Sequence, residues 1–198
     1  MNMKNELVFA PEGHIYRLAD SGQIVPSVTQ IIQAVFPFDA AGLVVERATN
    51  FGYAVHEGIS LDLKGCLNPS TVDDAIKPYI NQFWILFDSL SMLTVRAKTE
   101  IKLFHKSLHY AGRIDLVHAD TLIEIKTGQK NKTHRLQASA YKHLWNSNNP
   151  KEKVKDALIA YFDGGDEVPA IVRTEASDYN VFLSCLEIWK WKQKEGIK

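Results

Sequence analysis

The clearest regular pattern of apolar and polar positions lies in residues 112–128, which read GRIDLVHADTLIEIKTG. Residues 113–118 and 122–126 are rich in isoleucine, valine and leucine, and the segment between them, 119–121, is short and suited to a tight turn. Two such runs around a short turn predict a β-hairpin. We expect this hairpin to lie at the centre of the fold.

Charged side chains interrupt the apolar runs of this hairpin. Successive side chains of a strand point to opposite faces, so Glu124 and Lys126 share one face of their strand. Asp115 interrupts the preceding strand, so its carboxylate could meet this pair. Charges on a covered sheet face are costly unless they are paired or bind a metal. A lone E-x-K triplet is most simply a solvated ion pair, but the aspartate nine residues earlier and the apolar flanks favour a functional site.

Outside the hairpin, the spacing of apolar residues predicts an alternation of helices and strands. Strands are expected at 7–10 and 14–18 and helices at 28–36, 40–63 and 71–90, the first with Ser27 as its N-cap and the last with a bend or restart at Pro78. A strand is expected at 95–105, a helix at 133–145, strands at 156–162 and 168–173, and a helix at 177–194. This order predicts an α/β sandwich, a central mixed β-sheet flanked by helices. We expect residues 1–198 to form a single domain, with the hairpin and helix of residues 1–38 packed on its core.

The composition narrows the possible functions. Lysine plus arginine and aspartate plus glutamate each number 23, so the formal net charge is zero. Any DNA site must therefore be a local patch, partly created by bound metal. Cys66 and Cys185 form no CxxC pattern, which argues against a zinc site or an iron–sulfur cluster. No signal peptide and no membrane-spanning apolar run is visible, so we expect a cytoplasmic protein without membrane association.

Several short motifs resemble those of one enzyme family. Asp115 and the EIK triplet at 124–126 resemble the signature of the PD-(D/E)xK nuclease superfamily. More narrowly, the chain is similar to the branch that contains RecB-type nuclease domains and phage exonucleases. That branch often has G-x-x-D as its first motif, as in residues 112–115. It also carries a helical Q-x-x-x-Y, matched by residues 137–141, and an upstream helical histidine, matched by His56.

The resemblance implies a restriction-endonuclease-like fold and metal-dependent hydrolysis of phosphodiester bonds. The catalytic residues that it implies are Asp115, Glu124, Lys126, Gln137, Tyr141 and, as a further acidic candidate, Glu100. The metal ligands that it implies are His56, Asp115, Glu124 and the backbone carbonyl of Ile125. Carboxylate oxygens suit Mg²⁺ or Mn²⁺, and Lys126 would orient or help deprotonate the attacking water. For Glu100, pairing with a lysine across strands is an equally good interpretation.

Positive charge gathers after the strand that carries the lysine. The residues expected to contact DNA are Arg113, Lys130, Lys132, Arg135 and Lys142. Charged helix faces are usually only solvated, but beside a carboxylate cluster these side chains would be well placed to bind phosphates. The expected partners are DNA and a recombination or replication protein, and the oligomeric state stays open.

Three functions remain open: a DNA exonuclease of recombination, repair or phage DNA processing, an endonuclease of the same fold, and a catalytically silent DNA-binding subunit. The presence of Asp115, Glu124 and Lys126 together favours an enzyme, because a silent descendant has no chemical need for all three. No separate target-recognition domain is visible, which favours end-directed, sequence-tolerant cleavage.

Overall fold

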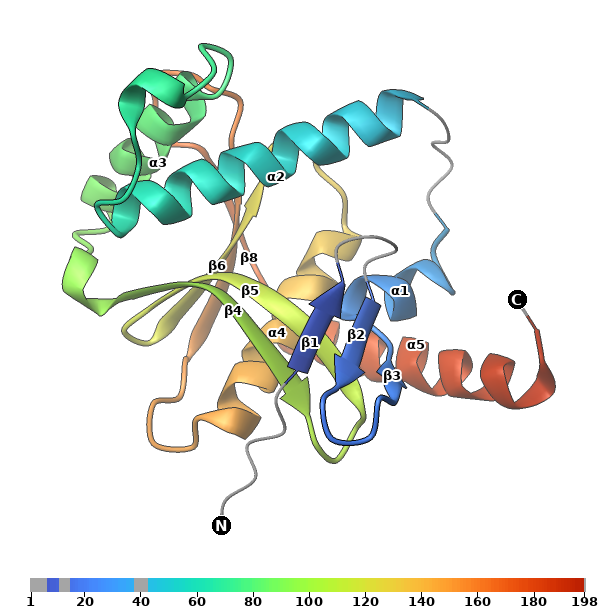
Figure 1. Ribbon diagram of the computed structural model, residues 1–198. Coiled ribbons are helices and arrows are strands. Elements are labelled where there is room, and N and C mark those ends of the chain that lie inside the picture. The colour runs from blue at the N-terminus through green and yellow to red at the C-terminus, as the bar shows by residue number, and fades with distance from the viewer. Residues whose placement is uncertain (1–6, 11–14, 38–42, 198) are drawn as a thin grey trace.

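The computed structural model describes residues 7–10, 15–37 and 43–197. Its centre is a five-stranded mixed sheet with the order β4-β5-β6-β7-β8, in which β6 and β7 are parallel and the other neighbours antiparallel (Figure 1). The strands are β1 Leu7–Ala10, β2 Ile15–Leu18, β3 Ile24–Val25, β4 Ala97–His105, β5 Tyr110–His118, β6 Thr121–Lys126, β7 Asp156–Tyr161 and β8 Ala170–Arg173. The helices are α1 Val28–Gln33, α2 Leu43–Leu63, α3 Lys77–Ser89, α4 Thr133–Asn148 and α5 Ala176–Glu195.

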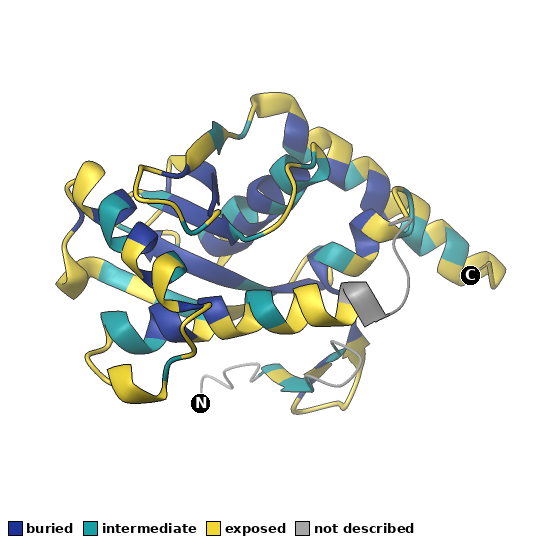
Figure 2. Ribbon diagram, turned by 90° about the horizontal axis from the view of Figure 1, so that it is seen from above, coloured by how far each residue is buried: buried dark blue, intermediate teal, exposed yellow. Residues whose placement is uncertain are grey.

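Helices cover both faces of this sheet. On one face, α2 and α3 share a hydrophobic core with β5, β6 and β7. On the other face, α1, α4 and α5 share a second core with the same strands. The ribbon coloured by burial shows the central strands buried between the helical layers (Figure 2). This arrangement confirms the predicted fold class and is consistent with a restriction-endonuclease-like fold.

The three N-terminal strands form a small antiparallel sheet beside the central one. Tyr16, Leu18 and Val25 pack with Phe104 of β4 and Ala111 of β5. Helix α1 follows directly and is closed by a capping box, in which the side chains of Ser27 and Gln30 bond each other's backbone N–H groups. The predicted start of α1 at a serine cap is therefore confirmed.

The central hairpin forms as predicted, with a shorter turn. Strand β6 begins at Thr121, so only Ala119 and Asp120 connect the strands, and Ala119 has a left-handed φ of 51°. A two-residue turn matches the right-handed twist of the strands when its residues take positive φ. The pairing within this hairpin positions the candidate site described below.

Several predicted boundaries were wrong. Helix α1 ends at Gln33 rather than at 36, α4 continues to Asn148 rather than ending at 145, and β8 begins at Ala170 rather than at 168. The helix expected at 71–90 begins only at Lys77, because Pro78 lies in its first turn rather than at a bend. Proline suits the first helical turn, where its missing N–H is not needed. The strand expected from residue 95 begins at Ala97, after a 3₁₀ turn at Thr94–Arg96. The expected first residues of two other elements, 14 and 40–42, lie outside the described residues.

None of the helices in the described part of the chain is both long and apolar enough to cross a membrane.

Helix α4 approaches β5 closely at Gly112. A Cβ atom on Gly112 would lie only 2.4 Å from Cε1 of Tyr141, so this position accepts no side chain unless the tyrosine ring moves. The glycine of the G-x-x-D motif and the tyrosine of the Q-x-x-x-Y motif are thus parts of one packing contact.

This contact gives a stability prediction. We expect Gly112→Ala to lower the free energy of unfolding by about 1–3 kcal/mol, the usual cost of overpacking a core. Gly128→Ala is the matched control, because nothing lies within 4 Å of a Cβ atom there. Urea unfolding of both variants measures the difference. Equal urea midpoints for the two variants would show that the Tyr141 ring moves aside without any loss of stability.

Candidate active site

The candidate site lies where β5 and β6 separate. Their pairing runs from His118 and Thr121 to Leu116 and Ile123 and does not continue beyond that pair. The N–H of Ile125 instead donates to Oδ2 of Asp115 at 2.8 Å. The Asp115 carboxylate therefore replaces a backbone acceptor and holds the two strands together across the gap.

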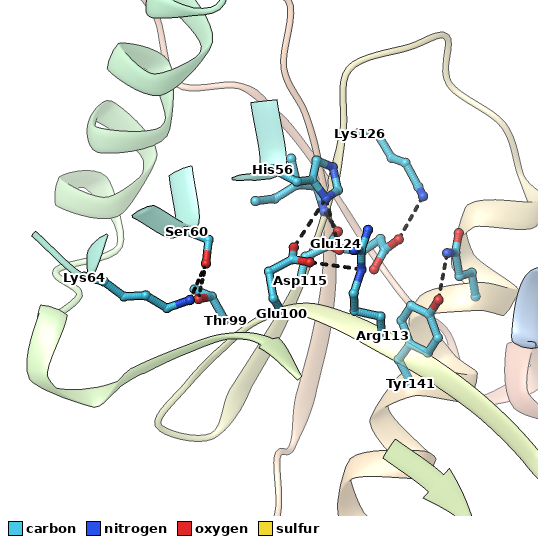
Figure 3. A network of polar contacts seen from close by, with 12 residues as sticks. His56, Ser60, Lys64, Thr99, Glu100, Arg113, Asp115, Glu124, Lys126 and Tyr141 are labelled. Atoms are coloured by element: carbon cyan, nitrogen blue, oxygen red, sulfur yellow. Dashed lines mark hydrogen bonds and ion pairs between the residues drawn. The ribbon is translucent and has the colours of Figure 1, made fainter. Parts of the chain in front are cut away.

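Glu124 and Lys126 extend from the other side of the gap. Ile123 and Ile125 pack in the core beneath α2 and α3, so the side chains that alternate with them leave β6 toward α4. Lys126 Nζ lies 2.8 Å from Oε1 of Glu124. The strand alternation that placed Glu124 and Lys126 on one face is confirmed, and the separation of the strands brings Asp115 to the same cluster (Figure 3).

Glu124 is the least satisfied carboxylate of the cluster. Its side chain is only 2% exposed, and its Oε2 has no hydrogen-bond partner among the described residues. Burial raises the pKa of Glu124, the negative charge of Asp115 raises it further, and Lys126 compensates only in part. A buried carboxylate oxygen without a partner is costly, so this oxygen is a candidate ligand for a cation.

Helix α2 contributes His56 to the same cluster. Its Nδ1 lies 3.2 Å from Oδ1 of Asp115 and 3.8 Å from Oε1 of Glu100, which are ion-pair distances, but it forms no well-aligned hydrogen bond with any described residue. Burial alone would lower the pKa of His56, but the neighbouring Asp115 carboxylate outweighs it and the pKa is raised. Burial alone would raise the pKa of Asp115, but the neighbouring His56 outweighs this effect, and the pKa of Asp115 is lowered.

Glu100 lies opposite Asp115 on β4, between the paired residues on either side of it. Its φ is 54°, a left-handed conformation that side-chain-bearing residues rarely adopt within a strand. Its Oε2 forms an ion pair with Nε of Arg113, at a distance of 2.9 Å. Burial raises the pKa of Glu100, and the negative charge of Asp115 raises it further. The positive charge of Arg113 lowers it, but by less, so the pKa is raised overall. The pairing of Glu100 is thus with an arginine of the neighbouring strand, not with a lysine.

Helix α4 closes the cluster on the far side. Gln137 Nε2 donates to the hydroxyl of Tyr141 at 3.2 Å, as their spacing of one helical turn allows. Tyr141 is buried, and its pKa is raised by burial and by the nearby Glu124. Figure 3 shows the Tyr141 ring on the α4 side of Glu124 and Lys126.

The donor atoms of this cluster fit a metal ion. Ligand atoms of His56, Glu100 and Asp115 all lie within 4.8 Å of one another. Glu124 lies outside this group, with Oε1 bonded to Lys126 and Oε2 unpartnered. His56 Nδ1, which faces the carboxylates of Asp115 and Glu100, and Glu124 Oε2, which has no partner among the described residues, are the atoms that a cation could satisfy. For Ile125 the structure records the N–H bond to Asp115, and a ligand role for its carbonyl stays a prediction.

The basic residues expected to contact DNA divide into two groups. Lys130 and Lys132 are exposed in the connection between β6 and α4. The other three are engaged in contacts within the protein: Arg113 with Glu100, Arg135 with Asp178 and Glu175 of the α5 N-terminus, and Lys142 with the backbone carbonyl of Lys155. The two lysines are thus the exposed members of the five, although Lys130 Nζ also lies over the Tyr161 ring, 5.8 Å from its centroid.

One part of the site was missed in the sequence. Ser60 and Thr99 join α2 to β4 through hydroxyl groups 2.8 Å apart, beside His56 and Glu100. The spacing of four residues between His56 and Ser60 on one helix face was the only available signal, and it did not reveal the partner on β4.

The chain was compared with known proteins. No family model and no curated protein sequence matches it. Among solved structures, a "Putative exonuclease" from Eubacterium rectale is similar at 10% identity and a TM-score of 0.49, over 80% of this chain and 69% of that one. A structure named SSO0001 is similar at 16% identity and a TM-score of 0.35, over 81% of each chain. Structural similarities with identities and TM-scores this low do not indicate a function for this protein.

Metal binding gives the first test of the site. We expect Mn²⁺ to raise the melting temperature of the wild-type protein, because a ligand that binds only the folded state stabilises it, by about 2.7 kcal/mol at a hundredfold excess over Kd. Asp115→Asn keeps an acceptor for the N–H of Ile125 but loses the anionic ligand, so its shift should disappear. Asp156→Asn, which removes an exposed partner of Arg173, is the control. An equal shift in Asp115→Asn would place the metal elsewhere.

Proposed function

We propose that this protein is a metal-dependent deoxyribonuclease, and more specifically a DNA exonuclease that acts in recombination, repair or phage DNA processing. The observation that carries this proposal is the buried cluster at the β5–β6 gap. There an aspartate with a histidine nitrogen 3.2 Å away and a lysine paired with a glutamate converge, and the second oxygen of that glutamate has no partner among the described residues. The motif resemblance supplies the reaction class, and the geometry supports it.

The proposed metal is Mg²⁺ or Mn²⁺. Asp115, Glu124 and His56 would hold it, with the carbonyl of Ile125, because hard carboxylate oxygens prefer these ions. The 3.2 Å between His56 Nδ1 and Asp115 Oδ1 is close to the spacing of about 3 Å between adjacent ligands of an octahedral ion with bonds of about 2.1 Å. When bound, the ion lowers the pKa of water and neutralises charge on the scissile phosphate.

Lys126 supplies a positively charged hydrogen-bond donor to the proposed reaction. An ammonium group cannot ligate a cation, but it can donate to an attacking water and to a developing negative charge. Burial opposes its charge, but Glu124 and Asp115 outweigh this and raise the pKa of Lys126, so it stays protonated. Lys126 therefore acts as an orienting donor in this mechanism.

Gln137, Tyr141 and Glu100 have supporting roles in this proposal. The Gln137–Tyr141 pair braces Glu124 from the α4 side, and Glu100 lies next to His56 with its charge balanced by Arg113. Lys130 and Lys132, exposed after β6, are the residues that we propose for binding the phosphates of the DNA strand.

A digestion assay tests the function. We expect wild-type protein to degrade end-labelled linear DNA with Mg²⁺ or Mn²⁺ and not with EDTA, and to leave covalently closed DNA intact. Lys126→Ala should lower single-turnover cleavage by about a hundredfold or more, as for the loss of one charge-stabilising donor in other enzymes. It should still bind DNA and metal. Lys190→Ala, which removes an exposed lysine paired with Glu187, should cleave at the wild-type rate.

The outcomes separate the alternatives. Cleavage of closed DNA would favour an endonuclease. DNA binding without any metal-dependent cleavage would favour a silent DNA-binding subunit. Wild-type cleavage rates in Lys126→Ala would contradict the proposed mechanism.

A further inference from the structure

Two consecutive turns of α2 meet two consecutive residues of β4. His56 approaches Glu100, with 3.8 Å between Nδ1 and Oε1. One turn further along the helix, the Ser60 hydroxyl lies 2.8 Å from that of Thr99. Figure 3 shows these contacts side by side beneath α2, with Lys64 next to the hydroxyl pair. The candidate metal ligand is thus one helical turn from a hydrogen-bonded tie to the sheet.

Neighbouring residues of a regular strand cannot both face the same helix, because their side chains alternate. Along β4, Ala97 packs on the α2 and α3 side, whereas Ile101 and Leu103 pack in the core on the α4 side. The odd-numbered residues therefore change faces at Glu100, which has the left-handed φ of 54°. This backbone turn allows Thr99 and Glu100 to face α2 together.

The hydroxyl pair is itself well fixed. Ser60 is 5% exposed, and Lys64 Nζ donates to its Oγ at 2.8 Å. Ser60 thus bonds to a residue one turn along its own helix and to a residue of the sheet. Such a tie restricts both the rotation and the sliding of α2 over β4.

We propose that Ser60 and Thr99 are positioning residues of the metal centre: their hydrogen bond fixes the turn of α2 that presents His56 to Asp115. This inference rests on the proposed metal site and adds to it residues that touch neither metal nor substrate. Partners behind the direct ligands commonly set metal affinity, and their loss costs roughly 10- to 100-fold.

The test is calorimetric Mn²⁺ binding to the full chain without DNA. Thr99→Val keeps the shape of the side chain and removes the hydroxyl, and we expect it to weaken Mn²⁺ affinity by at least about tenfold. Thr99→Ser should restore most of the affinity, which a purely steric role would not. Thr121→Val removes a hydroxyl at the distant end of β6 and should leave the affinity unchanged. Circular dichroism melting confirms that each variant is folded.

The outcomes distinguish this inference from the proposed function. If the wild-type protein binds no Mn²⁺, the metal site itself is wrong. If it binds Mn²⁺ and Thr99→Val binds equally well, only the positioning role is wrong. If Thr99→Val does not fold, Ser60→Ala is the second test, because it removes the same hydrogen bond from the helix side. Ser184→Ala on α5 is the control for this variant. Unchanged affinity in Ser60→Ala would overturn the inference.

Discussion

The burial of two carboxylates between β5 and β6 is the constraint on which the site depends. Removing a carboxylate from water costs several kcal/mol even after the protein relaxes. Asp115 is compensated by the N–H of Ile125 and by His56, and Glu124 by Lys126 on one oxygen only. The compensating groups come from two segments, Ile125 and Lys126 from β6 and His56 from α2, so the strand gap, α2 and the end of β6 must all be placed correctly for the charges to be tolerated. Oε2 of Glu124, without a partner among the described residues, could be satisfied by a cation.

The motifs that suggested a nuclease are also packing units. Gly112 leaves the space that the Tyr141 ring occupies, and Tyr141 accepts a hydrogen bond from Gln137 and lies near enough to Glu124 for that charge to raise its pKa. The left-handed Glu100 has a comparable double role, since it brings a carboxylate and the anchoring Thr99 to the same face of β4. Local strain of this kind persists where surrounding contacts determine it, and it gathers at functional sites.

Much of the fold follows from periodicity, because long amphipathic helices and an alternating hairpin leave clear patterns. The hairpin, the Ser27 cap and the alternation of Glu124 and Lys126 were predictable for this reason. The start of α3 was missed because Pro78 suits either a bend or a first turn. The reversal at Glu100, the end of pairing between β5 and β6, and the contact of Arg135 with α5 depend on tertiary packing. No pattern in the local sequence predicts these three features.

The charge balance of the cluster explains why a neutral protein can still be proposed to bind DNA. Counted as ionised, Glu100, Asp115 and Glu124 carry three negative charges, and Arg113 and Lys126 carry two positive ones. In that fully ionised state, with His56 neutral, the cluster would be negative by one charge, and the raised pKa values of His56, Glu100 and Glu124 show that it favours taking up protons to relieve this charge. A divalent cation changes this balance to one positive charge, since a bound ion is the largest local charge in such a site. In the proposed enzyme, metal binding and phosphate binding are thus linked electrostatically. The few exposed lysines after β6 would then guide the strand rather than supply most of the attraction.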